Sequence, residues 1–262
     1  MGNESFSVRT AIFLAAVCGQ TYLQYINKDG LYLAPSGYKS AGVIHANAYQ
    51  GRKERFGFVL ESKDTIIVAF RGTSSAVEWI SDLIAQQTVY KPIKQGGQTH
   101  KGFTDIYMSA RNELLSALGR LSPRKRLYVT GHSLGGALAV LAAPDIAVNT
   151  AHKRPHVYTF AAPRAGDPKF VRMFNAKVPV CWRIYNEHDI VPHLPPLIYR
   201  SPKNEEYYFY LHVKGEHKLS FKGGSVPGNH LMNGHFEVLA GKDPQYAAQM
   251  CSDPPSWCPM EI

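Results

Sequence analysis

Residues 128–139 carry the feature that most restricts the fold of this chain, the sequence YVTGHSLGGALA. It reads as an apolar strand, a Gly-x-Ser-x-Gly turn and a run of small helix-forming residues. Gly131 and Gly135 have no Cβ atom, so a strand and a helix can approach closely enough to form a sharp turn. We therefore expect Ser133 to stand at the end of a sheet, with the amide of Leu134 free to bind an oxyanion.

The residues on both sides of the turn favour a nucleophilic serine over an ordinary glycine-rich loop. Leu127 to Val129 form a short apolar strand, and residues 137–143 form a helical run that Pro144 is expected to close. A phosphate-binding loop would require Gly-x-x-x-x-Gly-Lys-[Ser/Thr], and the segment lacks its lysine. The pattern predicts that Ser133 is a nucleophile.

The order of the expected elements indicates an α/β fold. Helices are expected in residues 11–26 and 103–121, and apolar strands at 42–48, 56–60, 65–70, 127–129, 156–160 and 180–185. Strands that alternate with helices predict a mostly parallel or mixed central sheet with helices on both faces. Residues 195–228 read as loops with one strand near 207–213. Without an internal repeat or linker, residues 1–262 are expected to form a single domain.

The composition restricts the partners of the chain. Its net charge is +9, with basic clusters at 124–126, 152–154 and 214–222 that could attract an anionic interface, nucleic acid or fatty acids. A solvated basic surface explains them better than any specific partner, and no nucleic-acid motif accompanies them, so no nucleic-acid partner is expected. No apolar run is long enough to cross a membrane.

Two local patterns bear on processing and redox state. Ala11 to Val17 resemble a short signal peptide, but the helical spacing continues to Ile26, so we expect the first helix of the mature domain. Cys251 and Cys258 lie close together in a proline-rich tail, where a local disulfide is compatible with their spacing. Cys18 and Cys181 are expected to be buried free thiols. With no Cys-x-x-Cys pair, neither a metal nor a cofactor is expected.

A nucleophilic serine requires a base, and the base requires a carboxylate that orients it. Asp189 is the best-placed acid because it follows the strand at 180–185, at the end of the sheet where such sites assemble. Asp167 also follows a strand but reads as the N-cap of a helix. Glu187 is an alternative in a solvated loop.

Five histidines follow Asp189 in the sequence, and His230 is the preferred base. It lies between a glycine-rich loop and a helical segment, from which it could reach back over the sheet edge. His235 is its rival. The others are less suitable, because one is too near the acid in sequence and two are expected to be exposed: His193, His212 and His217.

A second oxyanion donor is expected after the central strand at 65–70. There Thr73 could provide both an amide and a hydroxyl group. A simple turn after the strand would explain the same residues.

Together these segments resemble the class 3 (fungal-type) triacylglycerol lipase family. In chain order, the resemblance is carried by AFRGTSS (69–75), WISDL (79–83), HKGF (100–103), GHSLGGA (131–137), TFAAPRAGD (159–167), DIVP (189–192) and NHL (229–231). It implies an α/β-hydrolase fold, no cofactor, and a triad of Ser133, Asp189 and His230. One departure is His235, which stands where the family usually has an aromatic residue.

The resemblance also implies an oxyanion hole from Thr73 and Leu134 and a mobile helical lid over residues 76–83. That segment is amphipathic, so it could cover the serine in water and open onto lipid, although a fixed helix facing the core has the same pattern. The apolar residues expected to contact the substrate are Val77, Trp79, Ile80 and Leu83.

These observations predict a triacylglycerol lipase that acts on lipid esters at an oil–water or membrane interface. Related esters are alternatives, which gives a phospholipase A1, a monoacyl- or diacylglycerol lipase or a feruloyl-type esterase. A catalytically inactive lipid-binding hydrolase fold is a more distant alternative. The resemblance favours secretion, although the chain shows no convincing signal peptide.

Overall fold

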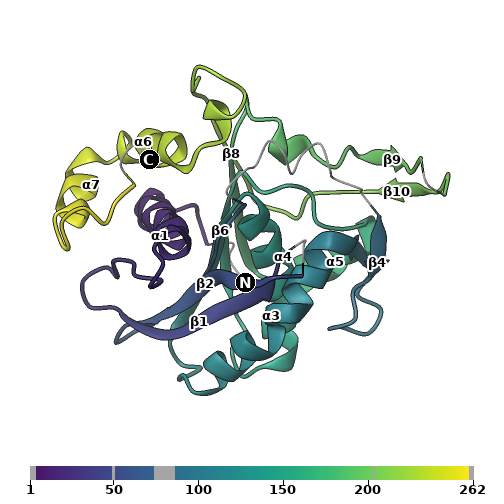
Figure 1. The fold of residues 1–262 in the computed structure, drawn as a ribbon, viewed down its shortest axis with the longest axis horizontal. Helices are drawn as coiled ribbons and strands as arrows, with labels where there is room; N and C mark the ends of the chain where they lie inside the picture. Colours follow the sequence, from purple (N-terminus) through teal and green to yellow (C-terminus); the bar gives the residue numbers. More distant parts are fainter. Residues whose placement is uncertain (1–3, 49–50, 74–85, 203, 260–262) are drawn as a thin grey trace.

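The computed structural model describes residues 4–48, 51–73, 86–202 and 204–259. Within these residues, drawn as a ribbon in Figure 1, seven strands form one sheet in the order β1-β2-β3-β6-β7-β8-β11. Their bounds are β1 Lys39–Asn47, β2 Lys53–Glu61, β3 Thr65–Phe70, β6 Arg126–His132, β7 His156–Phe160, β8 Val180–Asn186 and β11 Glu216–Leu219. Strands β3 to β11 of this sheet are parallel, whereas β1 and β2 are antiparallel to their neighbours. The mixed α/β sheet predicted from the sequence is confirmed.

Strand β3 shows how the sheet divides the apolar core into two layers. Ile66 and Val68 belong to the core on one face, whereas Ile67 and Ala69 belong to the core on the other. Successive side chains of a strand point to opposite faces, and every second residue therefore packs on the same layer. A strand buried on both faces requires the continuous apolar run that residues 65–70 provide.

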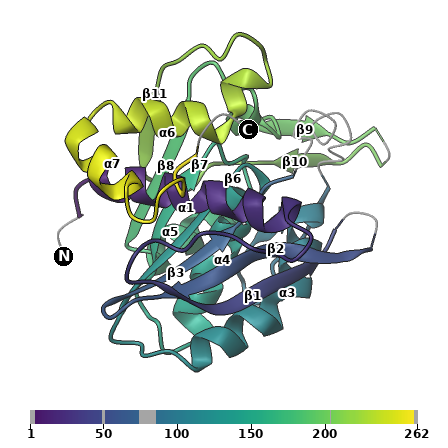
Figure 2. The ribbon, with the colours of Figure 1, turned by 60° about the vertical axis from the view of Figure 1, so that its left-hand side comes forward.

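Helices cover both faces of the sheet (Figure 2). Helices α3 Lys101–Gly119, α4 Leu134–Asn149 and α5 Pro168–Lys177 lie on one face, and α1 Val8–Ile26, α6 Met232–Ala240 and α7 Pro244–Cys251 lie on the other. Helix α1 begins at Ser7, whose hydroxyl accepts the Thr10 N–H at 3.2 Å. Its residues 11 and 12 and 14–17 are fully buried. No helix among the described residues is long and apolar enough to span a membrane.

Short elements complete the described fold. Strand β4 Gln87–Val89 pairs with β5 Gln98–His100, and β9 Ile198–Arg200 pairs with β10 Tyr207–Phe209, both outside the main sheet. Two 3₁₀ turns, η1 Val191–His193 and η2 Gly228–His230, follow the acid and carry the histidine that the sequence singled out.

The expectation that Pro144 closes the helix after the serine is wrong, because α4 continues to Asn149. A proline inside a helix removes one backbone hydrogen bond and costs about 3 kcal/mol. The turn after it is held by buried contacts: the Asp145 carboxylate accepts the Tyr107 hydroxyl at 2.5 Å and the Arg111 Nε–H at 2.6 Å. Burial of almost the whole of α4 against the sheet adds to these contacts.

The segment between 195 and 228 is more structured than expected. Residues 216–219 form β11, which pairs with β8 at the edge of the main sheet, and only Leu219 among them is buried. An edge strand is paired on one side alone and tolerates polar side chains, so its sequence shows no apolar run. The single strand expected near 207–213 is confined to β10.

The cysteines are arranged as the spacing suggested. Cys251 and Cys258 form a disulfide across seven residues, and Cys18 and Cys181 are free and buried. The bridge ties the end of α7 to the segment that carries Trp257, whose side chain is completely buried against α1. The tail is thereby part of the core on the α1 face.

Candidate active site

Ser133 occupies the sharp turn between β6 and α4, with φ 57° and ψ −128°. A positive φ at a residue with a Cβ is a strained conformation, and it persists where the surrounding structure enforces it. Two close approaches enforce it here: a Cβ on Gly131 would lie 2.2 Å from the Gly135 carbonyl oxygen, and a Cβ on Gly135 would lie 2.2 Å from that of Phe70. Both glycines of the Gly-x-Ser-x-Gly turn are therefore required by packing.

The Ser133 hydroxyl is buried without a hydrogen-bond partner among the described residues. Its backbone is fixed, because the Ser133 N–H donates to the Phe160 carbonyl at 2.9 Å. Leu134 is the first residue of α4, where backbone N–H groups have no partner within the helix. The serine side chain thus lies at the positive end of a buried helix.

Asp189 and His230 are in direct contact, although 41 residues separate them in the sequence. The Asp189 Oδ2 atom lies 2.6 Å from His230 Nδ1, and Oδ1 accepts the Val191 N–H at 3.0 Å. Both side chains are buried. A carboxylate only accepts, so His230 Nδ1 carries the proton and Nε2 has a free lone pair. That Nε2 is buried and has no partner among the described residues.

Asn186 joins the segments that carry these two residues, and sequence reasoning did not identify it. Its side-chain amide donates to the carbonyls of Phe221 and Asn229, both at 3.0 Å, and its Oδ1 accepts the Phe221 N–H at 3.1 Å. Asn186 also accepts the Asp189 N–H through its carbonyl at 3.1 Å. The signal available in the sequence was an asparagine at the end of an apolar strand, three residues before the acid. In the structure its side chain is completely buried.

The rival acids have other roles. Asp167 caps the N-terminus of α5, where its Oδ1 accepts the Phe170 N–H at 2.6 Å. Glu187 forms a surface ion pair with Lys218 at 2.9 Å. Neither contacts His230.

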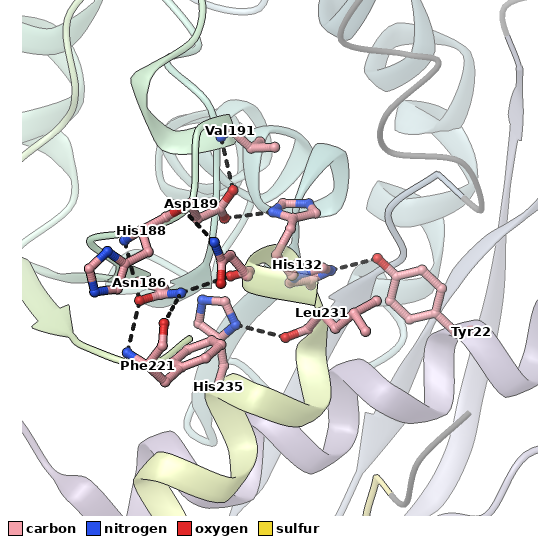
Figure 3. A network of polar contacts seen from close by, with 11 residues as sticks. Tyr22, His132, Asn186, His188, Asp189, Val191, Phe221, Leu231 and His235 are labelled. Atoms are coloured by element: carbon pink, nitrogen blue, oxygen red, sulfur yellow. Dashed lines mark hydrogen bonds and ion pairs between the residues drawn. The ribbon is translucent and has the colours of Figure 1, made fainter. Parts of the chain in front are cut away.

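The rival base is buried and forms its hydrogen bond with a backbone carbonyl, not with the acid. His235 Nδ1 donates to the Leu231 carbonyl at 3.0 Å, and burial lowers the pKa of its imidazole to about 4 (Figure 3). His212, which was expected to be exposed, is instead largely covered and bonded to the Pro192 carbonyl at 2.6 Å. Burial lowers its pKa to about 3. The expectation failed because the loop that carries His212 packs back against η1.

His132 and Tyr22 form a second buried contact with the histidine-bearing segment. His132 Nε2 lies 2.7 Å from the His230 carbonyl and must donate to it, so Nδ1 accepts the Tyr22 hydroxyl at 2.6 Å (Figure 3). Burial, with the neighbouring imidazoles of His230 and His235, holds the pKa of His132 well below its ordinary value. His132, the residue before the serine, is thus uncharged and connects α1 to η2 through its two hydrogen bonds.

The loop after β3 passes close to the serine. A Cβ on Gly72 would lie 2.3 Å from the Tyr22 hydroxyl and 3.0 Å from the Ser133 Cβ. Thr73 follows, and its Oγ1 is buried with no partner among the described residues. The predicted lid over 76–83, with Val77, Trp79, Ile80 and Leu83, lies outside the described residues.

In the part of the chain that the structure describes, no three or more His, Cys, Asp or Glu side chains lie close enough together to hold a metal ion. The basic clusters at 124–126 and 152–154 line one open cavity of about 680 Å³ beside the first residues of β6 and β7. This cavity is at the opposite end of β6 from Ser133.

Comparison with known proteins gives one family and a consistent set of relatives. A family profile described as Lipase (class 3) matches residues 67–199. The chain is 40% identical over 142 residues to a lipase of Rhizomucor miehei, covering 52% of this chain and 39% of that protein. It is 34% identical over 230 residues to the chloroplastic phospholipase A1-Igamma1 of Arabidopsis thaliana, covering 64% and 44%.

The fold resembles a solved structure as well. The structure of the Rhizomucor miehei triacylglyceride lipase is 27% identical, with a TM-score of 0.67, and the match covers 82% of this chain and 81% of that one. The chain spans about two fifths of the length of the first curated relatives that it matches.

Proposed function

Because the chain belongs to the lipase (class 3) family, we propose that it hydrolyses carboxylic esters with Ser133 as nucleophile, His230 as general base and Asp189 as the residue that orients the base. The observation that carries this proposal is the 2.6 Å contact of Asp189 with His230. It leaves a free imidazole nitrogen on a segment bonded to the residue before Ser133. A nucleophile, a base and an orienting acid are the parts that acyl transfer by serine requires.

The reaction proceeds in two steps. In the first, His230 Nε2 accepts the proton of the Ser133 hydroxyl while Oγ attacks the ester carbonyl, and His230 then protonates the departing alcohol. In the second, His230 removes a proton from the water that attacks the acyl carbonyl, and it then gives this proton to Ser133 Oγ as the bond to the acyl group breaks and the carboxylic acid leaves. Asp189 stabilises the imidazolium in both steps, since its carboxylate holds the Nδ1–H.

The amides of Thr73 and Leu134 are the proposed donors to the oxyanion. Leu134 supports this role because it begins α4, and Thr73 supports it because Gly72 packs against the serine. Removal of one such donor costs about 3–4 kcal/mol of transition-state stabilisation in a well-studied serine enzyme.

The proposed substrates are acylglycerols, with triacylglycerol preferred. The support is the 40% identity to a fungal lipase, together with the apolar residues of the proposed lid in the sequence, Val77, Trp79, Ile80 and Leu83. Similarity to a plant phospholipase A1 favours one second candidate, hydrolysis of the sn-1 ester of a phospholipid.

A substrate panel separates these candidates. Purified protein is given emulsified triacylglycerols of graded chain length, phosphatidylcholine vesicles and a soluble aryl ester, and fatty-acid release is titrated. The proposal predicts the fastest release from triacylglycerol, with activity per enzyme that rises as substrate passes from monomers to emulsion. Faster release from phosphatidylcholine would replace the first candidate by the second.

The proposed lid has its own test. Trp79→Ala should reduce the rise in activity at the emulsion and leave the rate on a soluble ester within about threefold. Equal rates of the unaltered protein on monomers and emulsion would contradict a lid that opens onto lipid.

A further inference from the structure

Arg71 is a buried arginine to which neither the sequence analysis nor the proposed mechanism assigns a role. It follows β3 directly, and its side chain is only 4% exposed. Its guanidinium makes three hydrogen bonds to three different groups: Nε to the Arg55 carbonyl at 2.8 Å, Nη1 to the Gly72 carbonyl at 2.7 Å, and Nη2 to Glu54 Oε2 at 2.7 Å. Because each of the three guanidinium nitrogens donates a hydrogen bond, this buried cation holds its acceptors in fixed positions.

The bond to Gly72 bears on the proposed oxyanion site through the geometry of one peptide. The Gly72–Thr73 bond is trans, since the cis bonds of the described chain lie elsewhere. In a planar trans peptide the carbonyl C=O and the following N–H point in opposite directions. Arg71 binds the Gly72 oxygen, and this contact therefore also sets the direction of the Thr73 N–H.

We propose that Arg71 is a positioning residue that locks the Gly72–Thr73 peptide so that the Thr73 N–H faces the oxyanion. This inference rests on the proposed function, since it assigns Thr73 as a donor. A peptide without this clamp can rotate and turn its carbonyl toward the site. A carbonyl oxygen there would repel the developing negative charge, whereas an N–H stabilises it.

The surroundings of Arg71 favour arginine over any other residue. The guanidinium plane lies over the ring of Tyr25, at 3.8 Å from its centroid, and near that of Phe56 at 4.3 Å. Two aromatic rings hold the plane, and the planar fork delivers its donors in fixed directions. A lysine has a single nitrogen on a flexible stem and cannot reach three separated acceptors in this way.

The loop is held from a second side. The Tyr22 hydroxyl would be 2.3 Å from a Cβ at position 72, so it lies directly against the Gly72 backbone. Tyr22 also forms a hydrogen bond with the Gly72 backbone, and Arg71 binds the Gly72 carbonyl. The Arg71 hydrogen bond to this carbonyl sets the plane of the Gly72–Thr73 peptide.

The test compares Arg71→Lys and Arg71→Met with the matched control Glu54→Gln. The control breaks the ion pair to Arg71 and leaves its bonds to the Arg55 and Gly72 carbonyls in place. Each variant is checked for folding by circular dichroism and thermal unfolding, and kcat and KM are measured on a soluble short-chain ester. The rate of phosphonylation by a fluorophosphonate is a second measure, since that reaction also develops a charge on oxygen.

Both Arg71 variants should lose about 10²- to 10³-fold in kcat and in the rate of phosphonylation, with KM changed by less than about threefold, as for loss of an oxyanion donor. Glu54→Gln should keep kcat within about threefold. In a third Arg71 variant, Arg71→Ala, added guanidinium should restore part of the activity, whereas it should restore none in Ser133→Ala.

Two results would overturn the clamp. The first is folded Arg71→Lys with unchanged kcat, and the second is an equal loss in Glu54→Gln, which would make the ion pair to Glu54 the important contact. Failure of the proposed function looks different, because the unaltered protein would then neither hydrolyse esters nor react with the phosphonate.

Discussion

Replacement of Asp189 by asparagine tests whether the carboxylate orients His230, because the two side chains have nearly the same size and shape. The carboxylate accepts two N–H groups, one from His230 Nδ1 at 2.6 Å and one from Val191 at 3.0 Å. The two N–H groups face different oxygens of the carboxylate, and an amide has an oxygen at only one of these two positions. Either the new NH₂ group faces the Val191 N–H, or it donates to Nδ1 of His230.

Each arrangement has a cost. Two donors facing one another in a buried site leave a lost hydrogen bond, which costs about 1–3 kcal/mol. Donation to Nδ1 moves the imidazole proton to Nε2, so His230 can no longer accept a proton from Ser133. In serine proteases the same exchange lowers kcat by about 10⁴-fold, which corresponds to about 5.4 kcal/mol of activation free energy.

We therefore expect Asp189→Asn to lower kcat on a soluble ester by about 10⁴-fold, with KM little changed. The matched control is Asp167→Asn, the same chemical change at the rival acid. Asparagine caps a helix as well as aspartate does, so the control should keep both its melting temperature and its kcat. A loss of less than tenfold in Asp189→Asn, or an equal loss in Asp167→Asn, would refute the assignment.

Three further predictions concern single residues. His230→Ala should lower kcat by about 10⁴-fold or more, whereas His235→Asn keeps it within about tenfold; the reverse order in a steady-state assay would exchange their roles. Burial lowers the pKa of His100 to about 3, below its unfolded value near 6.5, so the unfolded chain binds the extra proton and stability falls as pH drops between these values. His100→Asn keeps the cap on α3 and should reduce the slope of unfolding free energy against pH by about 1.4 kcal/mol per unit in urea titrations from pH 6 to 4, and an unchanged slope would count against it. Gly72→Ala should lower kcat at least about tenfold, because its Cβ would lie 2.3 Å from a tyrosine hydroxyl, whereas Gly119→Ala, with open space around it, retains full activity.

Local patterns in the sequence predicted most of the sheet and the turn at Ser133. The strand before the serine is apolar because it is buried on both faces, and the two glycines are required within four residues of each other, so the signal is contained in one short segment. Asp189 was found in the same way, as an acid just beyond a buried strand. By contrast, β11 pairs at a sheet edge and exposes polar residues, so its sequence carries no periodicity.

Contacts between residues far apart in the sequence could not be predicted from local sequence patterns. Sequence alone left His235 as a rival base, because nothing within residues 229–236 shows which imidazole reaches across 41 residues to Asp189. Tyr22, His132 and Arg71 are brought together by the packing of α1 against the turn at Ser133 and the loop after β3. Their partners are backbone carbonyls, a ring nitrogen and the distant carboxylate of Glu54, none of which shows in the local residue spacing.

The central claim is that Ser133 is the nucleophile of an ester hydrolase, and covalent labelling tests it most directly. The protein is treated with a fluorophosphonate, digested and examined by mass spectrometry, with Ser133→Ala treated in parallel. We predict one phosphonyl adduct, on Ser133, that forms as hydrolysis is lost and is missing from the variant. Ser133 left unmodified in a folded protein, or hydrolysis that persists after Ser133 is fully labelled, would contradict it.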